Sequence, residues 1–170
     1  MKRILFMENV ALCSLLSVTT AFPCTTFVLE GGGKIYFGRN LDWDWESGMV
    51  VVNPRGVQKT ALVMPGHAPA KWKSKYGSVT FNQFGDEVPF GGMNEAGLVV
   101  DNMWLDETQY PTADSRPEIN MLQWVQYQLD TCRTVAEVLA NDSKIRLAAR
   151  PCGWPRSTAT LSLPALMRMK

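Results

Sequence analysis

The residue best placed to do chemistry is Cys24, which follows a leader-like segment. If residues 1–23 are removed, Cys24 becomes the first residue and its own α-amino group lies within reach of its thiol. An α-amino group titrates near pH ~8, so part of it is unprotonated at neutral pH and can act as a base. The thiolate then attacks a carbonyl carbon, and the ammonium returns the proton to the leaving amine. The alternative interpretation is a cysteine buried in a core strand.

The leader has the three-part layout of a secretory signal. Met1–Arg3 is basic, Val10–Leu16 is apolar, and Val18–Ala21 holds small residues. The apolar run is too short for a transmembrane helix. We therefore expect export to the periplasm or the extracellular space, with no stable membrane insertion after the leader is removed.

Two residues keep other interpretations of the leader open. Glu8 interrupts its apolar part, and Pro23 stands directly before Cys24, which is unusual for signal peptidase. Cleavage after Ala21, followed by trimming or self-cleavage, is one alternative. A buried N-terminal helix is another.

Two charged residues are expected beside the new N-terminus. Residues 24–30 and 34–40 read as strands, and three glycines between them predict a turn. In such a hairpin the end of the second strand returns beside the start of the first, which brings Arg39 and Asp42 close to Cys24. An arginine favours thiolate over thiol, and a carboxylate can orient an amino group. The alternative is a simple surface ion pair, which contributes little.

The remaining elements follow from local patterns. Further strands are expected at residues 49–53, 60–64, 78–84, 90–93 and 98–105, the last two joined by a turn at 94–97. Pro117 predicts the start of a helix that runs to about Asp130, with Ile119, Leu122, Val125 and Leu129 on one face. Thr134 and Glu137 have capping-box spacing, so a second helix is expected to begin at Thr134 and end near 141–142, with Val135, Val138 and Leu139 on its core side. Trp124 and Cys132 are expected to be core residues.

The bulk composition excludes several kinds of protein. The chain has 170 residues, of which 46% are apolar and 19% charged, as in one globular domain. Removal of residues 1–23 leaves 15 basic and 15 acidic residues, which gives no electrostatic reason to expect nucleic acid as a partner. The four cysteines match no zinc spacing, and His67, the one histidine, is expected to be a plain surface loop residue. No metal or other cofactor is expected. In an exported protein Cys132 and Cys152 could pair.

Three motifs resemble those of the choloylglycine hydrolase family, which contains the penicillin V acylases and the bile salt hydrolases. They are Cys24–Phe27 (CTTF), Phe37–Trp43 (FGRNLDW) and Met93–Leu98 (MNEAGL). The resemblance implies an α+β fold, the N-terminal portion of an αββα Ntn-hydrolase sandwich of antiparallel sheets flanked by helices. It also implies hydrolysis of linear amide C–N bonds, with a small-molecule acyl-amide as substrate and a homo-oligomer as a possible assembly.

The resemblance also implies roles for individual residues. Cys24 is the nucleophile and base, Arg39 lies beside the thiol, and Asp42 bonds the α-amino group. Family members form part of the oxyanion hole with a residue that corresponds to Trp104 here. Because tryptophan donates a single N–H, Trp104 is expected to shape the substrate pocket together with Trp43 while backbone N–H groups bind the oxyanion. Asn102 is a further oxyanion candidate.

The chain departs from the family in its C-terminal part. Family members are about twice as long, and the Asn and Arg that their second half adds to the site have no counterpart here. We therefore expect residues 1–23 as signal peptide or pro-segment, 24–147 as a partial Ntn-hydrolase domain, and 148–170 as an aberrant, irregular tail produced by a frameshift or a truncated gene. Two hypotheses follow: an exported amide hydrolase of the penicillin V acylase or bile salt hydrolase type, or a truncated remnant without turnover.

Overall fold

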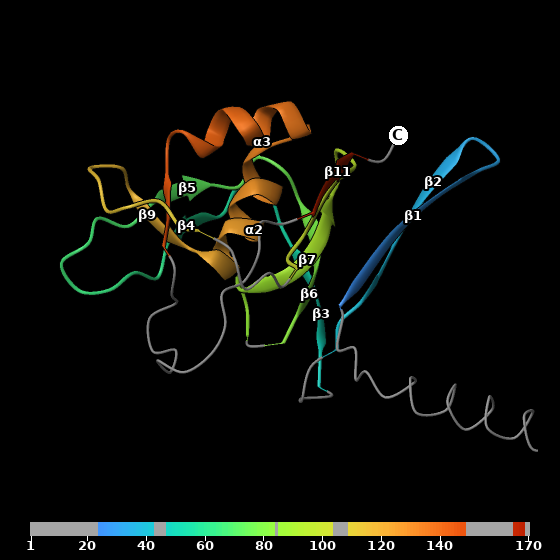
Figure 1. Ribbon diagram of the computed structural model, residues 1–170, viewed down its shortest axis with the longest axis horizontal. Helices are drawn as coiled ribbons and strands as arrows, with labels where there is room; N and C mark the ends of the chain where they lie inside the picture. Colours follow the sequence, from blue (N-terminus) through green and yellow to red (C-terminus); the bar gives the residue numbers. More distant parts are fainter. Residues whose placement is uncertain (1–23, 43–46, 84, 104–108, 149–164, 169–170) are drawn as a thin grey trace, which may run out of the picture.

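The structure, a computed structural model, describes residues 24–42, 47–83, 85–103, 109–148 and 165–168. Figure 1 shows how the strands and helices are arranged. The elements are β1 (Thr25–Gly31), β2 (Lys34–Asn40), β3 (Met49–Asn53), β4 (Gln58–Thr60), β5 (Lys71–Lys73), β6 (Ser78–Asn82), β7 (Pro89–Asn94), β8 (Leu98–Asp101), β9 (Glu118–Asn120), α2 (Met121–Thr131), α3 (Val135–Asp142), β10 (Arg146–Ala148) and β11 (Ala165–Arg168). None of the helices in these ranges has the length and apolar character needed to cross a membrane.

The main sheet has five antiparallel strands in the order β11-β8-β7-β6-β3. β6, β7 and β8 follow one another as a meander, and β3 lies at the edge, where Met49 pairs with Asn82. The strands predicted at 49–53, 78–84 and 90–93 are confirmed, with small shifts of their ends. The strand predicted at 60–64 is wrong, because pairing with β5 ends at Thr60 and residues 61–64 are irregular.

Strand β6 carries different kinds of side chain on the two faces of this sheet. Helix α2 packs on β7 and β8, and residues Met121–Asp130 are buried. In β6 the buried residues are the polar Ser78, Thr80 and Asn82, whereas Val79 and Phe81 are exposed. Other exposed apolar residues of β3 and β7 are Val50, Val52 and Met93. The face away from α2 is therefore an exposed apolar surface, and we call it the open sheet face.

Strands β1 and β2 form the predicted hairpin, which projects away from the helices in Figure 1. Gly32 and Gly33 have φ values of 59° and 73°, the left-handed region that favours glycine. Gly38 is required for another reason: a Cβ there would lie 2.0 Å from Cζ of Phe27, the residue it faces across the hairpin. The turn and this ring contact fix the register Thr25↔Asn40, which determines which residues surround Cys24.

Helix α2 begins later than Pro117 predicts. Glu118–Asn120 is extended and pairs in parallel with β10, so Ile119 lies in a strand. Asn120 is the N-cap, since its side-chain oxygen accepts from the Gln123 backbone N–H at 2.9 Å. The prediction of a helix start at Pro117 is therefore wrong, although the core positions predicted for the helix, Leu122, Val125 and Leu129, are buried.

Helix α3 begins where the sequence predicts. The Thr134 side chain accepts from the Glu137 backbone N–H at 3.2 Å, and the Glu137 carboxylate accepts from the Arg133 backbone N–H. Val138 is buried as predicted, but Leu139 is 67% exposed and does not belong to the core. The main core gathers α2, α3, β8 and β9, and it contains Leu98, Val100, Ile119, Trp124, Val125, Leu129, Cys132 and Val138.

Two segments differ from their sequence descriptions. His67 is 44% exposed in its loop, but its Nδ1 lies 2.5 Å from a carboxylate oxygen of the buried Glu118, so it is not a plain surface residue. In the segment 148–170, Ala165–Arg168 forms β11 beside β8, while 149–164 lies outside the described residues. Cys132 is a free thiol, and Cys152, with which it could pair in an exported protein, lies outside the described residues.

Candidate active site

Cys24 lies directly before β1, at the open end of the hairpin. Its Sγ is 4.0 Å from the backbone carbonyl oxygen of Asp42, which follows β2. The thiol is partly exposed and free. The hairpin register thus brings the start of β1 and the segment after β2 together, as the sequence suggests.

The carboxylate of Asp42 is turned toward a different neighbour. Its Oδ1 accepts a hydrogen bond from Nδ2 of Asn40 at 2.9 Å, and both residues are on the exposed side of the hairpin. The contact with Cys24 is made by the Asp42 backbone. Bonding of the Asp42 carboxylate to a free α-amino group of Cys24 therefore stays a prediction.

Arg39 points from β2 toward the main sheet. It pairs with Thr26, which lies two residues after Cys24, so the alternation of β1 puts Cys24 and Arg39 on one face of the hairpin. Such diagonal neighbours are about 7–8 Å apart at their backbones. The Arg39 side chain is only 11% exposed, so its positive charge is poorly screened by water.

Three groups of the main sheet hold the Arg39 guanidinium. Nη2 donates to the backbone carbonyl of Asn102 at 3.1 Å, and Nε lies 3.1 Å from Oδ1 of Asp101. The guanidinium carbon is 5.6 Å from the centre of the Phe90 ring, a cation–π distance. Nε and Oδ1 are at ion-pair distance but are not aligned for a hydrogen bond. Neither atom has a hydrogen bond within the described residues.

Asp101 is buried at the end of β8, and its carboxyl lies against Gly91 of β7. A Cβ on Gly91 would be 2.2 Å from Oδ2 of Asp101, so this position accepts only glycine without a shift of the carboxyl. Burial raises the pKa of Asp101 from 3.8 to about 7, and the neighbouring Arg39 charge opposes that rise. Near neutral pH this carboxyl is therefore divided between its neutral and its ionised form.

Asn102 is buried and has one unsatisfied donor. Its backbone N–H donates to the Phe90 carbonyl at 2.7 Å, and its own carbonyl accepts from Arg39. Its side-chain Nδ2 has no hydrogen-bond partner among the described residues. A buried N–H without a partner is uncommon, although the role of Asn102 as an oxyanion donor stays a prediction.

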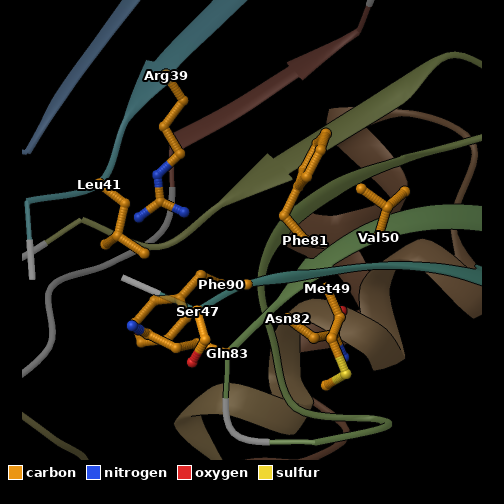
Figure 2. Close-up of a pocket in the computed structure, with 10 residues that line it drawn as sticks. Arg39, Leu41, Ser47, Met49, Val50, Phe81, Asn82, Gln83 and Phe90 are labelled. Atoms are coloured by element: carbon orange, nitrogen blue, oxygen red, sulfur yellow. The ribbon is translucent and has the colours of Figure 1, made fainter. Parts of the chain in front are cut away.

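A hollow of about 470 Å³ opens beside Arg39. Figure 2 shows Arg39 and Leu41 on one side and Val50 and Phe81 on the other. The remaining lining residues are Ser47, Gly48, Met49, Asn82, Gln83 and Phe90. The hollow is therefore mostly apolar with one cation, which suits an acyl group that carries a polar end. Trp43 and Trp104, which are expected to shape the substrate pocket, lie outside the described residues.

Comparison with known proteins identifies the family. The family model described as linear amide C–N hydrolases, choloylglycine hydrolase family, matches residues 24–163. The chain belongs to this family. The match covers the hairpin, strands β3, β6, β7 and β8 of the main sheet and both described helices, so it includes every residue of the site described above.

Individual relatives agree with this family assignment. The chain is 30% identical over 174 aligned residues to a penicillin V acylase from Pectobacterium atrosepticum, with 92% of this chain and 46% of that protein covered. The structure of penicillin V acylase from Agrobacterium tumefaciens matches with a TM-score of 0.65 and 32% identity, over 85% of this chain and 46% of that one. A mutant conjugated bile acid hydrolase from Clostridium perfringens matches with a TM-score of 0.64 and 21% identity, over 81% and 43%.

These matches settle the fold class. The α+β architecture predicted from the sequence, the N-terminal portion of an αββα Ntn-hydrolase sandwich, is confirmed. The chain spans somewhat less than half the length of the relatives that it matches. The choloylglycine hydrolase fold also explains why a flat apolar face, the open sheet face, lies opposite α2: one sheet of a sandwich packs against another.

Two residues around Arg39 escaped the sequence analysis. Asp101 directly follows three apolar residues, Leu98–Val100 (LVV), and an acidic residue inside a buried strand is unusual unless it is paired. That signal was available in the sequence. Phe90 carried no such signal, because nothing local indicates that its ring faces an arginine 51 residues earlier.

Proposed function

We propose that this chain hydrolyses a linear amide C–N bond, with Cys24 as the nucleophile after residues 1–23 are removed. The observation that carries the proposal is the arrangement at the open end of the hairpin. A free, partly exposed thiol lies beside the Asp42 backbone, and the partly buried Arg39 lies on the same face. Family membership supports the same class of reaction.

The proposed reaction has two stages. The α-amino group of Cys24 takes the thiol proton, and Arg39 stabilises the thiolate by its charge. The thiolate attacks the amide carbon, the C–N bond breaks, and the resulting ammonium gives its proton to the leaving amine. A thioester remains on Cys24. Water then attacks this thioester with the α-amino group again as base, so that the acid is released and the thiol is restored.

The oxyanion formed during attack needs hydrogen-bond donors. We propose the unpaired Nδ2 of Asn102 as one such donor, together with backbone N–H groups. Trp104 and Trp43 are proposed as pocket walls, as the sequence suggests. Asp42 is proposed to orient the α-amino group by exchanging its bond with Asn40.

The proposed substrate is a small acyl-amide whose apolar acyl group fills the hollow beside Arg39. Phenoxyacetyl-type penicillins, conjugated bile acids and acyl-homoserine lactones have this chemistry. We favour the first because two penicillin V acylases are 30% and 32% identical to this chain. The leader supports the proposal that the protein is exported to the periplasm or the extracellular space. The balanced charge gives no electrostatic reason to propose a nucleic-acid partner. A homo-oligomer is proposed from the family resemblance alone.

The test compares three forms of the protein on penicillin V and on a glycine-conjugated bile acid. They are the form that begins at Cys24, its Cys24→Ser variant, and the chain that keeps its leader, each verified by intact mass. We expect turnover by the first form alone, because an amide nitrogen on Cys24 is not a base. Absence of Cys24-dependent turnover in a soluble, folded sample would reject the proposal.

The alternative proposal is a chain of this family without turnover. Its support is the open sheet face, where Val52 is 76% exposed and Phe81 is 57% exposed. An apolar face of this kind favours association or aggregation over a stable monomer. The two proposals differ in one measurement, since the alternative predicts equal and negligible rates for Cys24 and Cys24→Ser in a folded sample.

A further inference from the structure

We propose that Asp101 is a positioning residue that holds the Arg39 guanidinium on the Cys24 face of the hairpin. This inference rests on the proposed function, in which Arg39 stabilises the Cys24 thiolate. It goes beyond that function because it names the group that fixes Arg39. The observations are contacts and packing around β7 and β8.

The first observation is that the end of β8 provides two of the three contacts of Arg39. Asp101 faces Nε and the next residue, Asn102, accepts from Nη2, both at 3.1 Å. The backbone of Asn102 is itself fixed, because its N–H donates to the Phe90 carbonyl at 2.7 Å. Without the Asp101 contact, the guanidinium would be held by this one hydrogen bond and by the cation–π contact with the Phe90 ring, and it could turn about the hydrogen bond. A second contact, at Nε, removes that freedom.

The second observation is that the position of the Asp101 carboxyl is itself fixed by packing. Asp101 pairs with Gly91 in the register of β7 and β8, and its carboxyl occupies the space where a Cβ of residue 91 would stand. Asp101 is 2% exposed, so water does not replace this contact. Burying a carboxyl group costs free energy unless a charged or hydrogen-bonding neighbour compensates for the lost hydration, and Arg39 is the charged neighbour of Asp101.

The third observation is that the hairpin has little else to orient Arg39. β1 and β2 form their own two-stranded sheet, separate from the five-stranded one. Arg39 reaches from this hairpin to the neighbouring strands β7 and β8. Because the two sheets are separate, the guanidinium can move relative to Cys24 while the main sheet stays unchanged.

The experiment measures the pH dependence of Cys24 alkylation by iodoacetamide in the full chain, with peptide mass mapping to separate Cys24 from the other cysteines. The matched pair is Asp101→Asn and Asp101→Ala. Both remove the negative charge, but only alanine removes the acceptor near Nε. Glu95→Gln is the control, because it removes one acid from the turn after β7, where its partner is Arg55.

We expect Cys24 at neutral pH to react about three- to tenfold more slowly in Asp101→Ala than in Asp101→Asn, since a well-placed opposite charge shifts a thiol pKa by about one unit. Asp101→Asn and Glu95→Gln should stay near the wild-type rate. In an Arg39→Met background the difference between alanine and asparagine should vanish. If Asp101→Ala does not fold, Asp101→Ser serves in its place, because its shorter hydroxyl does not reach Nε.

The outcomes separate this inference from the proposed function. Equal rates for alanine and asparagine, or a difference that persists without Arg39, would overturn the role of Asp101 and leave the nucleophile untouched. If Arg39→Met itself leaves Cys24 unchanged, the role of Arg39 fails, and the role of Asp101 fails with it. If the form that begins at Cys24 shows no Cys24-dependent turnover but the alkylation rates of the variants are as expected, the proposed hydrolase function is rejected and the positioning role of Asp101 is retained.

Discussion

Asp101 makes the stability of this protein depend on pH in a way that one substitution removes. Burial raises its pKa from 3.8 to about 7 despite the nearby Arg39. Between these two values the folded protein holds a proton at Asp101 that the unfolded chain has already released. Folding is therefore favoured by this proton at low pH, and the contribution is lost as the pH rises through about 7.

The size of the effect follows from the same two values. One proton held over one pH unit contributes about 1.4 kcal/mol, and the interval from about pH 5 to the pKa near 7 spans roughly two units. The free energy of unfolding should thus fall by roughly 2–3 kcal/mol through Asp101 alone between about pH 5 and pH 8. Solvent screening does not reduce this figure much, because Asp101 is 2% exposed.

The assay is urea unfolding, followed by tryptophan fluorescence, of wild type and Asp101→Asn at several values between about pH 5 and pH 8. Asparagine has nearly the same shape and does not titrate, so all other titrating groups cancel in the comparison. We expect the free energy of unfolding of Asp101→Asn, relative to that of wild type, to rise by roughly 2–3 kcal/mol between about pH 5 and pH 8. Arg39→Met should move the loss of stability to higher pH, because the Arg39 charge lowers the pKa of Asp101. Parallel pH profiles for wild type and Asp101→Asn would refute the reasoning.

Three further predictions concern groups that hold the sheet and the helices. Gly91→Ala should lower the free energy of unfolding by about 1–3 kcal/mol, because its Cβ would press on the Asp101 carboxyl, and an unchanged urea midpoint would contradict this contact. Asp130→Ala should lower it by about 3–5 kcal/mol in the same assay, since it removes the nearer of the two carboxylates beside the buried Lys59 ammonium, at 3.3 Å against 3.8 Å for Glu87, together with the acceptor of the Trp72 Nε1–H, and a loss below that of Gly91→Ala would contradict this account. Thr134→Ala should cost about 1 kcal/mol and reduce helical circular dichroism near the transition, whereas Thr134→Ser should retain the cap.

The parts of the fold that the sequence predicts well are those determined by near neighbours. The β1–β2 hairpin depends on adjacent glycines with positive φ, and the start of α3 depends on a threonine that caps a residue three positions away. The start of α2 depends instead on pairing of Glu118 with Arg146, 28 residues later. A first-turn proline is a local signal and carries no information about that partner, so the predicted helix began too early.

The same distinction applies to the site. Proximity of Cys24 to the segment after β2 follows from the hairpin alone, and the structure has that contact. The partners of Arg39 lie on or directly after β7 and β8, more than 50 residues away, and among them only the acidic Asp101 in a buried strand differed from what the local sequence pattern predicts. The alternation of β6 shows two kinds of face, yet it cannot say that the polar side chains turn toward α2 and the apolar ones away from it.

Arg39 has two roles in this structure, and an experiment on the site must separate them. Its charge lies on the face of Cys24, and its guanidinium connects the hairpin to the main sheet through Asp101, Asn102 and Phe90. A substitution of Arg39 therefore changes the thiol pKa and the seating of the hairpin at once, so a loss of turnover does not identify its cause. Lysine keeps the charge but cannot make both contacts of the planar guanidinium. If Cys24 alkylation stays fast in Arg39→Lys while turnover falls, the loss of turnover comes from the changed position of the hairpin. If alkylation and turnover fall together, the loss comes from a weaker effect of the positive charge on the Cys24 thiol.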